Sequence, residues 1–470
     1  MTKDFSERGY WWVPGKEHRV PGIFQFSLED GVSLEVDGAL DPREGLETIQ
    51  RRDWANEPCI LGFTRSGDRM TLVGCFRVFR SVGKISRETW GVGLALLGRH
   101  LSSADSRLWR RMDVTYSHLD EWAAMSGIRC EATKGDDGES EKSVRYKKPA
   151  GVEGRVDPLR ITVESTDAWN LGGFEVKVTE SAILRVQSEQ PISFDEWMAK
   201  CLWPMQQLIG FATDARVRTT TLKFYCDDDT EAGLPGGVDG GAVRAIITQR
   251  NVATGSRVYP HEMLFSLPEV ANRFDDFLAR WFALTHDLES VCSQMFAVRQ
   301  VDGMLVNHQF LSMAQAVESY HSRHGQRRHV MPPPEHRQRK SEVLCKFDGG
   351  VHEWLKEKLA YSNEPTLYER LIDILERVAP ALPPLIPDPR AFARKITDTR
   401  NYYTHYSSGL KKKAADGVLL WRYAQALSFI LAACILLDLG FQPEECKMKL
   451  NNNPQYWPLR DALQDAFPVS

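Results

Sequence analysis

The sequence predicts an α+β protein: a β-rich region with helical insertions over residues 1–300, followed by an all-helical bundle over residues 301–470. Three observations support this class. The chain of 470 residues is longer than one ordinary domain. Alternating apolar and polar residues, typical of half-buried strands, recur through the first region. After residue 300 the apolar residues follow helical spacing instead.

A β-hairpin is predicted close to the N-terminus. Residues 22–28 and 32–36 alternate between apolar and polar side chains, and Glu29, Asp30 and Gly31 lie between them. An Asp-Gly pair between two such segments is typical of a hairpin turn. Further strands are predicted at residues 60–63, 70–79, 159–163, 174–178, 182–186, 219–224 and 244–248, with polar or glycine-rich loops at 134–142 and 227–241.

Capping signals predict helices in both regions. Ser193 and Glu196 form a capping box before a helix that Pro204 is expected to kink, and Ser266 and Glu269 form another before a longer helix. In the second region, helices are predicted at residues 310–320, 351–361, 366–378, 389–406 and 418–439. Polar residues interrupt the last of these, so its apolar run is too short to span a bilayer and a buried helix is expected.

Two groups of residues could bind a metal ion. Residues 321–340 form a basic segment with three consecutive prolines and the histidines His321, His324, His329 and His336. These histidines lack cysteine partners and regular spacing, which favours a flexible basic linker over a zinc site. Asp227, Asp228 and Asp229 could hold a cation, but the glycines that follow favour a loop. We therefore expect no metal and no cofactor.

The charge is unevenly divided. Residues 301–470 contain 22 Lys and Arg and 19 Asp and Glu, a net charge of +3, which leaves 37 basic and 44 acidic residues, a net charge of −7, in residues 1–300. A basic helical region suits a polyanion partner, and ordinary scatter explains the division equally well. The nine cysteines form no CxxC pair, and the N-terminus has no apolar signal core. Reduced thiols and a cytoplasmic location are expected.

The residues best suited to chemistry are Arg400, Asn401 and His405, near the end of the helix predicted at 389–406. A histidine can transfer protons near neutral pH. A guanidinium can bind a phosphate through two hydrogen bonds, and an amide can orient either group. Together these side chains could cleave RNA without a metal.

Helical geometry separates these residues from the expected core. Successive residues turn by about 100°, which gives the helix a core face of Phe392, Ile396, Thr399 and Tyr403. The opposite face carries Arg394, Asp398, Asn401 and His405, while Arg400 lies at the border. A solvated polar face is the alternative interpretation. Arg394 could bind RNA phosphates, together with Lys411, Lys412 and Lys413, which follow the helix; a solvated turn explains the lysines as well.

The arrangement Arg400-Asn401-x-x-x-His405 in a helical region resembles the HEPN ribonuclease signature. Its setting, residues 397–406, is specifically similar to the ApeA-like HEPN group, as is the upstream segment 316–319. Residues 22–36, 70–75 and 118–122 resemble the N-terminal domain that accompanies it. The resemblance implies an anti-phage defence protein of the abortive-infection kind, in a bacterial cytoplasm.

This resemblance assigns roles to individual residues. His405 would act as general acid or base, Arg400 would bind the scissile phosphate, and Asn401 would orient one of them. Glu318 and Asp398 would support the site; Glu318 could pair with Arg400 or simply be a surface carboxylate. The products would be a 2′,3′-cyclic phosphate and a 5′-hydroxyl. A homodimer or higher homo-oligomer through the HEPN domain is expected, since one chain offers one histidine for two proton transfers.

The resemblance also implies partners: RNA, with tRNA as one candidate class, and a phage-encoded trigger bound by the N-terminal region, which would act as a sensor; no membrane partner is expected. Three alternatives stay open. The helical region could be a non-catalytic HEPN scaffold that binds RNA or oligomerises, or the chain could act only through contacts, as an antitoxin does. A metal-dependent nuclease is the third alternative, and no carboxylate pair has spacing that favours it.

Overall fold

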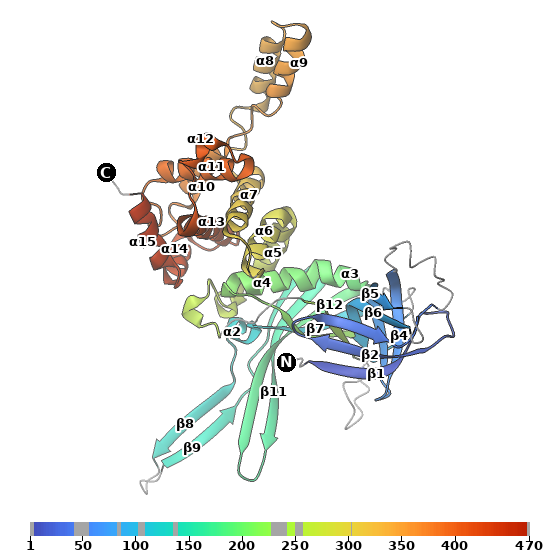
Figure 1. The fold of residues 1–470 in the computed structure, drawn as a ribbon. Helices are drawn as coiled ribbons and strands as arrows, with labels where there is room; N and C mark the ends of the chain where they lie inside the picture. Colours follow the sequence, from blue (N-terminus) through green and yellow to red (C-terminus); the bar gives the residue numbers. More distant parts are fainter. Residues whose placement is uncertain are drawn as a thin grey trace. The chain divides into compact units, whose positions relative to one another are not determined.

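The computed structural model describes residues 4–41, 56–81, 86–101, 109–134, 140–226, 242–249, 257–301 and 303–467. The chain forms two compact units (Figure 1). Met1–Pro260 and Phe265–Ala279 make the first, and His261–Leu264 and Arg280–Ser470 make the second. The first unit is rich in strands and the second is helical, which confirms the predicted fold class.

The two units divide before residue 301. Helix α6 (Glu289–Gln300) packs against α7 (Val306–His324) and belongs to the helical unit. The boundary expected at residue 300 puts α6 in the N-terminal region, because the apolar residues of α6 alone do not show which partner buries them.

Strands β1 to β6 close into an antiparallel barrel. Their order is β6-β3-β2-β1-β4-β5, and β5 pairs again with β6. Closure leaves no unpaired edge within the barrel. Its strands are β1 (Phe5–Trp12), β2 (Val20–Ser27), β3 (Gly31–Val36), β4 (Asn56–Thr64), β5 (Arg69–Ser81) and β6 (Arg87–Leu97).

The barrel interior is filled by large apolar side chains. Trp11, Phe24 and Trp90 are buried there. The ring of Trp11 lies over Gly62, where an added Cβ would meet it at 2.1 Å, so only glycine fits. The predicted hairpin is confirmed: β2 pairs with β3, and Gly31 at the turn has φ +84°, a left-handed conformation that favours glycine.

A second sheet continues from β6. Residues 94–97 of β6 pair with β14, beyond the part of β6 that pairs with β3. The order then runs through β14 (Val243–Ile247), β13 (Thr219–Tyr225), β7 (Trp109–Tyr116), β12 (Val176–Ile192), β11 (Leu159–Leu171) and β10 (Val152–Val156). A separate ribbon joins β8 (Ile128–Lys134) to β9 (Ser140–Tyr146). The two strands predicted at 174–178 and 182–186 are one strand, β12.

Short helices accompany the sheets: α2 (Leu119–Ala123), α3 (Phe194–Trp197) and α4 (Trp203–Thr213). The capping box of Ser193 and Glu196 is present. The expected kink at Pro204 takes the form of a π-helical turn, Met198–Leu202, just before it. The box of Ser266 and Glu269 opens two 3-10 turns, and α5 itself runs from Phe274 to Asp287.

The helical unit is built around α13 (Gly417–Asp438), which packs against α7, α10, α14 and α15. By length and composition alone α13 could cross a membrane, but 67% of its most apolar window is buried within the protein. The prediction of a buried helix is confirmed. The other helices are α8 (Pro333–Leu344), α9 (Gly349–Lys358), α10 (Leu367–Val378), α11 (Pro389–His405), α12 (Ser408–Lys411), α14 (Pro443–Asn452) and α15 (Tyr456–Ala466).

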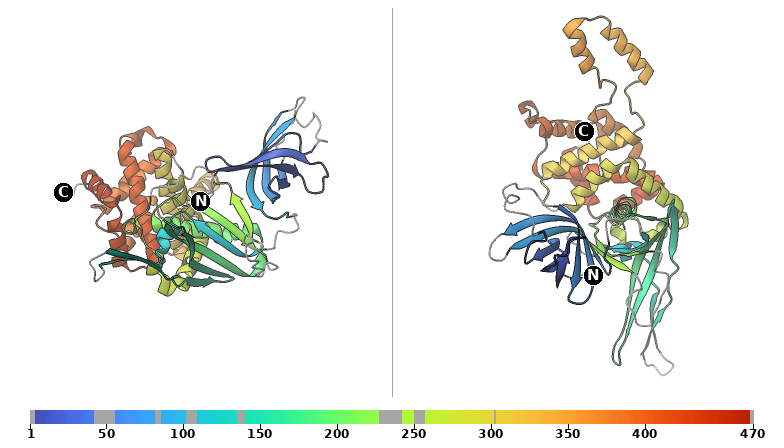
Figure 2. Two further views of the ribbon diagram at one scale, coloured as in Figure 1. Left: turned by 90° about the horizontal axis from the view of Figure 1, so that it is seen from below. Right: turned by 90° about the vertical axis from the view of Figure 1, so that its right-hand side faces the viewer.

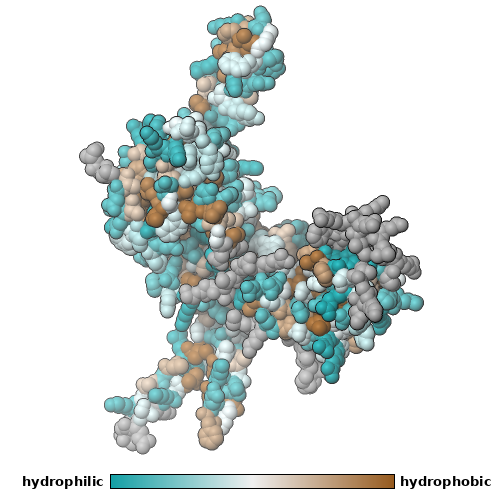
Figure 3. Space-filling model, viewed as in Figure 1, coloured by the Kyte–Doolittle hydropathy of each residue, from teal (hydrophilic) through white to brown (hydrophobic). Residues whose placement is uncertain are grey.

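The interpretation of residues 321–340 as a flexible linker is wrong for most of the segment. Helix α7 continues through His324, and α8 begins at Pro333, since proline is well tolerated in a first helical turn. Helices α8 and α9 form an arm that projects from the rest of the helical unit (Figures 1 and 2) and buries none of its own residues. Apolar surface is exposed on this arm (Figure 3), including Trp354.

Candidate active site

Helix α11 carries the predicted motif and has well-defined ends. At its start, Asp388 Oδ1 accepts hydrogen bonds from the backbone N–H groups of Arg390 and Ala391, both at 2.9 Å, and Pro389 occupies the first turn. Its last helical residue is His405. The predicted core face is buried at Phe392, Ile396 and Thr399. The motif therefore lies in the final turns of a helix that is anchored on its other side.

Arg400 is held by two oxygen atoms. Its guanidinium forms an ion pair with Glu318 of α7, and Nη1 donates a hydrogen bond to Asn401 Oδ1 at 3.0 Å. The Arg400 side chain is 26% exposed. A guanidinium has five N–H donors, and these two contacts leave others to bind a phosphate. The expected pairing of Glu318 with Arg400 is present.

The His405 side chain is exposed at the end of α11 and forms no hydrogen bond with any residue in the described part of the chain. Five residues of helix place it about 7.5 Å along the axis from Arg400 and about 140° around it. Within one chain, the two side chains therefore leave the helix in different directions. In one copy, His405 is thus exposed at the end of α11, away from Arg400.

The sequence analysis missed a group of tyrosines next to His405. The ring centroids of Tyr402 and Tyr406 are 5.6 Å apart, and Tyr403 lies 5.1 Å from Tyr402. Tyr406 follows the helix with φ +50°, a left-handed conformation that costs a non-glycine residue about 1–2 kcal/mol. The repeated tyrosines are visible in the sequence, but this change of direction is not.

The lysine cluster is held beside the end of α11. Two hydrogen bonds tie Ala415 to the helix: its N–H donates to Thr399 Oγ1 at 3.1 Å, and its carbonyl accepts from the Tyr403 hydroxyl at 3.2 Å. Burial raises the pKa of Tyr403, so this hydroxyl keeps its proton. The exposed lysines 411–413 lie in the segment that returns from Tyr406 to Ala415.

Arg394 and Asp398 lie on earlier turns of α11. The Arg394 guanidinium lies 5.7 Å from the ring centroid of Tyr368. Arg394 lies eleven positions before His405, and this offset corresponds to about 16 Å along the helix axis. The structure thus brings Arg400, Asn401 and Glu318 together, with His405 and the lysines beside them, and leaves Arg394 apart.

Comparison with known families decides which group of proteins this is. A model described as ApeA N-terminal domain 1 matches residues 6–281, more than half of the chain. A model described as Apea-like HEPN matches residues 311–445. The chain belongs to the ApeA-like HEPN family. HEPN domains form a family of RNases in defence systems, and the matched segment includes both α7 and α11. No curated protein and no solved structure matches the chain.

Three of the four histidines that could have bound a metal in this ApeA-like HEPN protein have separate partners. His324 Nδ1 lies 3.3 Å from Asp438, and His336 Nε2 lies 2.9 Å from Ser362 Oγ. Within the described ranges no group of His, Cys, Asp and Glu could hold a metal ion. The candidate cation ligands Asp227, Asp228 and Asp229 lie outside those ranges.

His321 is fully buried beneath α10. Its Nε2 lies 2.9 Å from Asp373 Oδ2, and its buried Nδ1 has no partner among the described residues. Burial lowers the pKa of His321. The native state therefore holds a neutral ring whose Nε2–H donates to the carboxylate.

Acid is expected to destabilise the helical unit through His321. Its pKa in the folded chain lies below the ordinary value of 6.5, so the unfolded chain takes up the proton first as the pH falls. The contribution of neutral His321 to the free energy of unfolding is fully present above about pH 6.5. It is lost as the pH falls through the pKa of His321 in the folded chain. Urea unfolding at pH 7.5 and 5.5 measures this loss. The His321→Asn variant should lose less stability between these two pH values than wild type does. An equal loss in the variant would contradict this role for His321.

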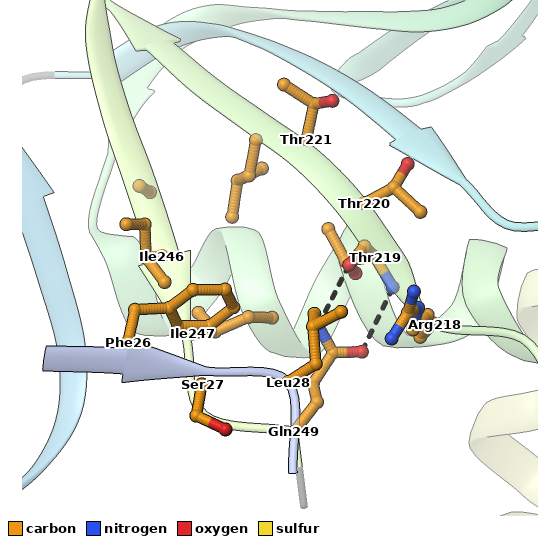
Figure 4. Close-up of a pocket in the computed structure, with 12 residues that line it drawn as sticks. Phe26, Ser27, Leu28, Arg218, Thr219, Thr220, Thr221, Ile246, Ile247 and Gln249 are labelled. Carbon is orange, nitrogen blue, oxygen red and sulfur yellow. Dashed lines mark hydrogen bonds between the residues drawn. The ribbon is translucent and has the colours of Figure 1, made fainter. Parts of the chain in front are cut away.

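The β-rich unit of this ApeA-like HEPN protein contains a small cavity between the end of β2 and strands β13 and β14 (Figure 4). The Gln249 side chain closes one side, where it accepts from Thr219 N at 3.0 Å and donates to Thr219 O at 3.2 Å. The cavity holds about 40 Å³, enough for a few water molecules and too little for a nucleotide. We interpret it as a packing feature.

Glu318 is expected to position Arg400 for the reaction. Glu318→Ala removes the ion pair and should lower kcat by roughly tenfold, because small displacements of a catalytic group are costly. Glu318→Gln keeps an acceptor oxygen and should retain most of the activity. Initial rates on one RNA substrate give kcat and KM for each. Equal rates for Glu318→Ala and wild type would rule out this role.

Proposed function

We propose that this ApeA-like HEPN protein is a metal-independent endoribonuclease whose catalytic residues are Arg400, Asn401 and His405. The observation that carries the proposal is the arrangement on α11. An arginine held by Glu318 and Asn401 precedes an exposed histidine at the end of the same helix. These are the groups that phosphate binding and proton transfer require.

In the proposed reaction the 2′-hydroxyl of RNA attacks the adjacent phosphorus. His405 accepts the 2′ proton or donates a proton to the departing 5′ oxygen. Arg400 binds the non-bridging oxygens and stabilises the negative charge that accumulates on them. The bond from phosphorus to the 5′ oxygen breaks. One strand ends in a 2′,3′-cyclic phosphate and the other begins with a 5′-hydroxyl, so atoms and protons balance without water or metal.

A dimer would supply both proton transfers. Each copy offers one histidine in the motif, and the open surface at the end of α11 could face a second copy. Sedimentation of the purified protein should give twice the chain mass of 53.4 kDa. A fully active monomer at all concentrations would contradict this part of the proposal.

We further propose that the RNase acts in anti-phage defence by abortive infection in the bacterial cytoplasm, with host or phage RNA, including tRNA, as the substrate. The N-terminal β-rich unit would bind the phage-encoded trigger. A nuclease that is toxic to its own cell must be restrained until infection, and the larger unit is the part of the chain that could do so.

The test is RNA cleavage in the presence of EDTA. Purified wild type is incubated with total cellular RNA beside His405→Ala and Arg400→Ala. We expect cleavage by wild type alone. Cleavage by wild type only when EDTA is left out, or equal cleavage by the variants, would show that the assignment is wrong.

One observation favours a second candidate function. Glu318 partly neutralises Arg400, and such a pair could equally belong to a non-catalytic HEPN scaffold that binds RNA or oligomerises. A scaffold would bind RNA and leave it intact in the EDTA assay.

A further inference from the structure

Three tyrosine rings contact one another at the end of α11. Tyr402 lies 5.1 Å from Tyr403 and 5.6 Å from Tyr406, with interplanar angles of 72° and 61°. Tyr403 and Tyr406 complete the group at 6.2 Å. Tyr403 is tied to the returning segment through Ala415, Tyr402 is half-buried, and Tyr406 is exposed.

Tyr406 is the member that the fold does not explain. Its side chain is 63% exposed, so burial does not account for a large aromatic residue at this position. Its φ of +50° is the left-handed conformation in which helices usually end with glycine. A residue held in a disfavoured conformation beside a candidate active site points to a functional role.

The surroundings of Tyr406 suit RNA. His405 precedes it directly, Arg400 lies on the same helix, and the exposed lysines 411–413 follow within the same returning segment. Aromatic rings bordered by basic side chains are the usual means of holding a single-stranded nucleic acid, since bases stack on the rings while cations bind phosphates.

We infer that Tyr402 and Tyr406 form a subsite for an unstacked nucleobase next to the scissile phosphate, so that the substrate is single-stranded or looped RNA. This inference rests on the proposed function, which supplies the neighbouring phosphate. Stacking of the base orients the ribose whose 2′-hydroxyl reacts, and paired RNA cannot present such a base. Loss of one stacked base on an aromatic ring weakens binding by roughly 10- to 100-fold.

The experiment measures binding apart from cleavage. Full-length His405→Ala protein is titrated into a short RNA that contains one 2-aminopurine, whose fluorescence falls when the base stacks. We expect quenching by single-stranded RNA and little binding of the duplex form. Adding Tyr406→Gly should abolish the quenching and raise Kd by about 10- to 100-fold. Glycine accepts the left-handed backbone, so this variant is expected to fold.

Two controls separate the ring from other effects. Tyr406→Phe keeps the ring and should bind like its parent. Tyr361→Ala removes a more exposed tyrosine (75%) that follows α9 and should also leave binding unchanged. Unchanged quenching with Tyr406→Gly would overturn the inference. So would a shift of the oligomer to monomer with base binding intact, because Tyr406 would then be a subunit contact.

The inference and the proposed function can fail separately. Wild type that cleaves RNA in EDTA, together with Tyr406→Gly that matches it in KM and kcat, rejects the subsite and keeps the enzyme. Wild type that cleaves nothing, together with quenching that depends on Tyr406, keeps the subsite and rejects the enzyme.

Discussion

Replacement of His405 by alanine is expected to reduce RNA cleavage by about 10²- to 10⁴-fold, the usual contribution of a general acid or base. His405 is exposed at the end of α11, so the variant should fold normally and lose only proton transfer. Arg400→Ala should lower the rate of RNA cleavage by about 10²- to 10³-fold, because the phosphate loses its charged donor. Arg400→Lys should recover little, since an ammonium cannot form the same paired hydrogen bonds.

These effects are measured as initial rates on a labelled RNA with EDTA present. Arg390→Ala is a matched control: Arg390 is exposed in the first turn of the same helix, about 22 Å from His405 along the axis. Its rate should match wild type. Equal losses in all three alanine variants would point to general electrostatic binding and against a catalytic role for His405.

Replacement of Asp373 by alanine is expected to have the largest effect on stability. Asp373 is 4% exposed, and its Oδ2 accepts hydrogen bonds from His321 Nε2 at 2.9 Å and from the backbone N–H groups of Gln326 and Arg327 at 3.0 and 3.2 Å. The variant leaves these donors without an acceptor, which should cost about 1–3 kcal/mol for each donor that stays buried. The same bonds hold the start of the segment that leads to the arm of α8 and α9.

Urea unfolding followed by circular dichroism measures this change. Glu376→Ala is the matched control on the same helix. Glu376 binds Arg327 at the surface and is 56% exposed. Its replacement should lower the free energy of unfolding by no more than about 1 kcal/mol. A stability equal to that of wild type in Asp373→Ala would show that the buried network contributes little.

The sequence predicted those parts of the fold whose causes are local. The Asp30-Gly31 turn and the capping boxes at Ser193 and Ser266 are all present. Each depends on residues within four positions of one another, so one sequence is sufficient to recognise it.

Other features depend on distant partners. Strands β1, β6 and β7 were not predicted, because β6 owes its position to pairing with β3, β5 and β14, which are far apart in the sequence. Helices α14 and α15 were missed for the same reason, since packing against α13 stabilises them. Helix α8 was not predicted, because its first residues belong to a run of three prolines at residues 332–334.

The candidate site shows the same division. The helical placement of Arg400, Asn401 and His405 followed from periodicity alone. The ion pair to Glu318 spans 82 residues and could only be offered as one of two possibilities. The tyrosine group could not be predicted, because Tyr406 contacts Tyr402 through a left-handed turn after the helix, which helical periodicity does not describe.

The most direct test of the account is the chemistry of the cut ends. A defined RNA is cleaved in EDTA, and its products are analysed by mass spectrometry, with a second RNA carrying a single 2′-deoxy nucleotide at the cut site. We predict a 2′,3′-cyclic phosphate and a 5′-hydroxyl from the first RNA, no cleavage of the second at that site, and no products with His405→Ala. A 5′-phosphate product, or cleavage that requires a divalent metal, would contradict the account.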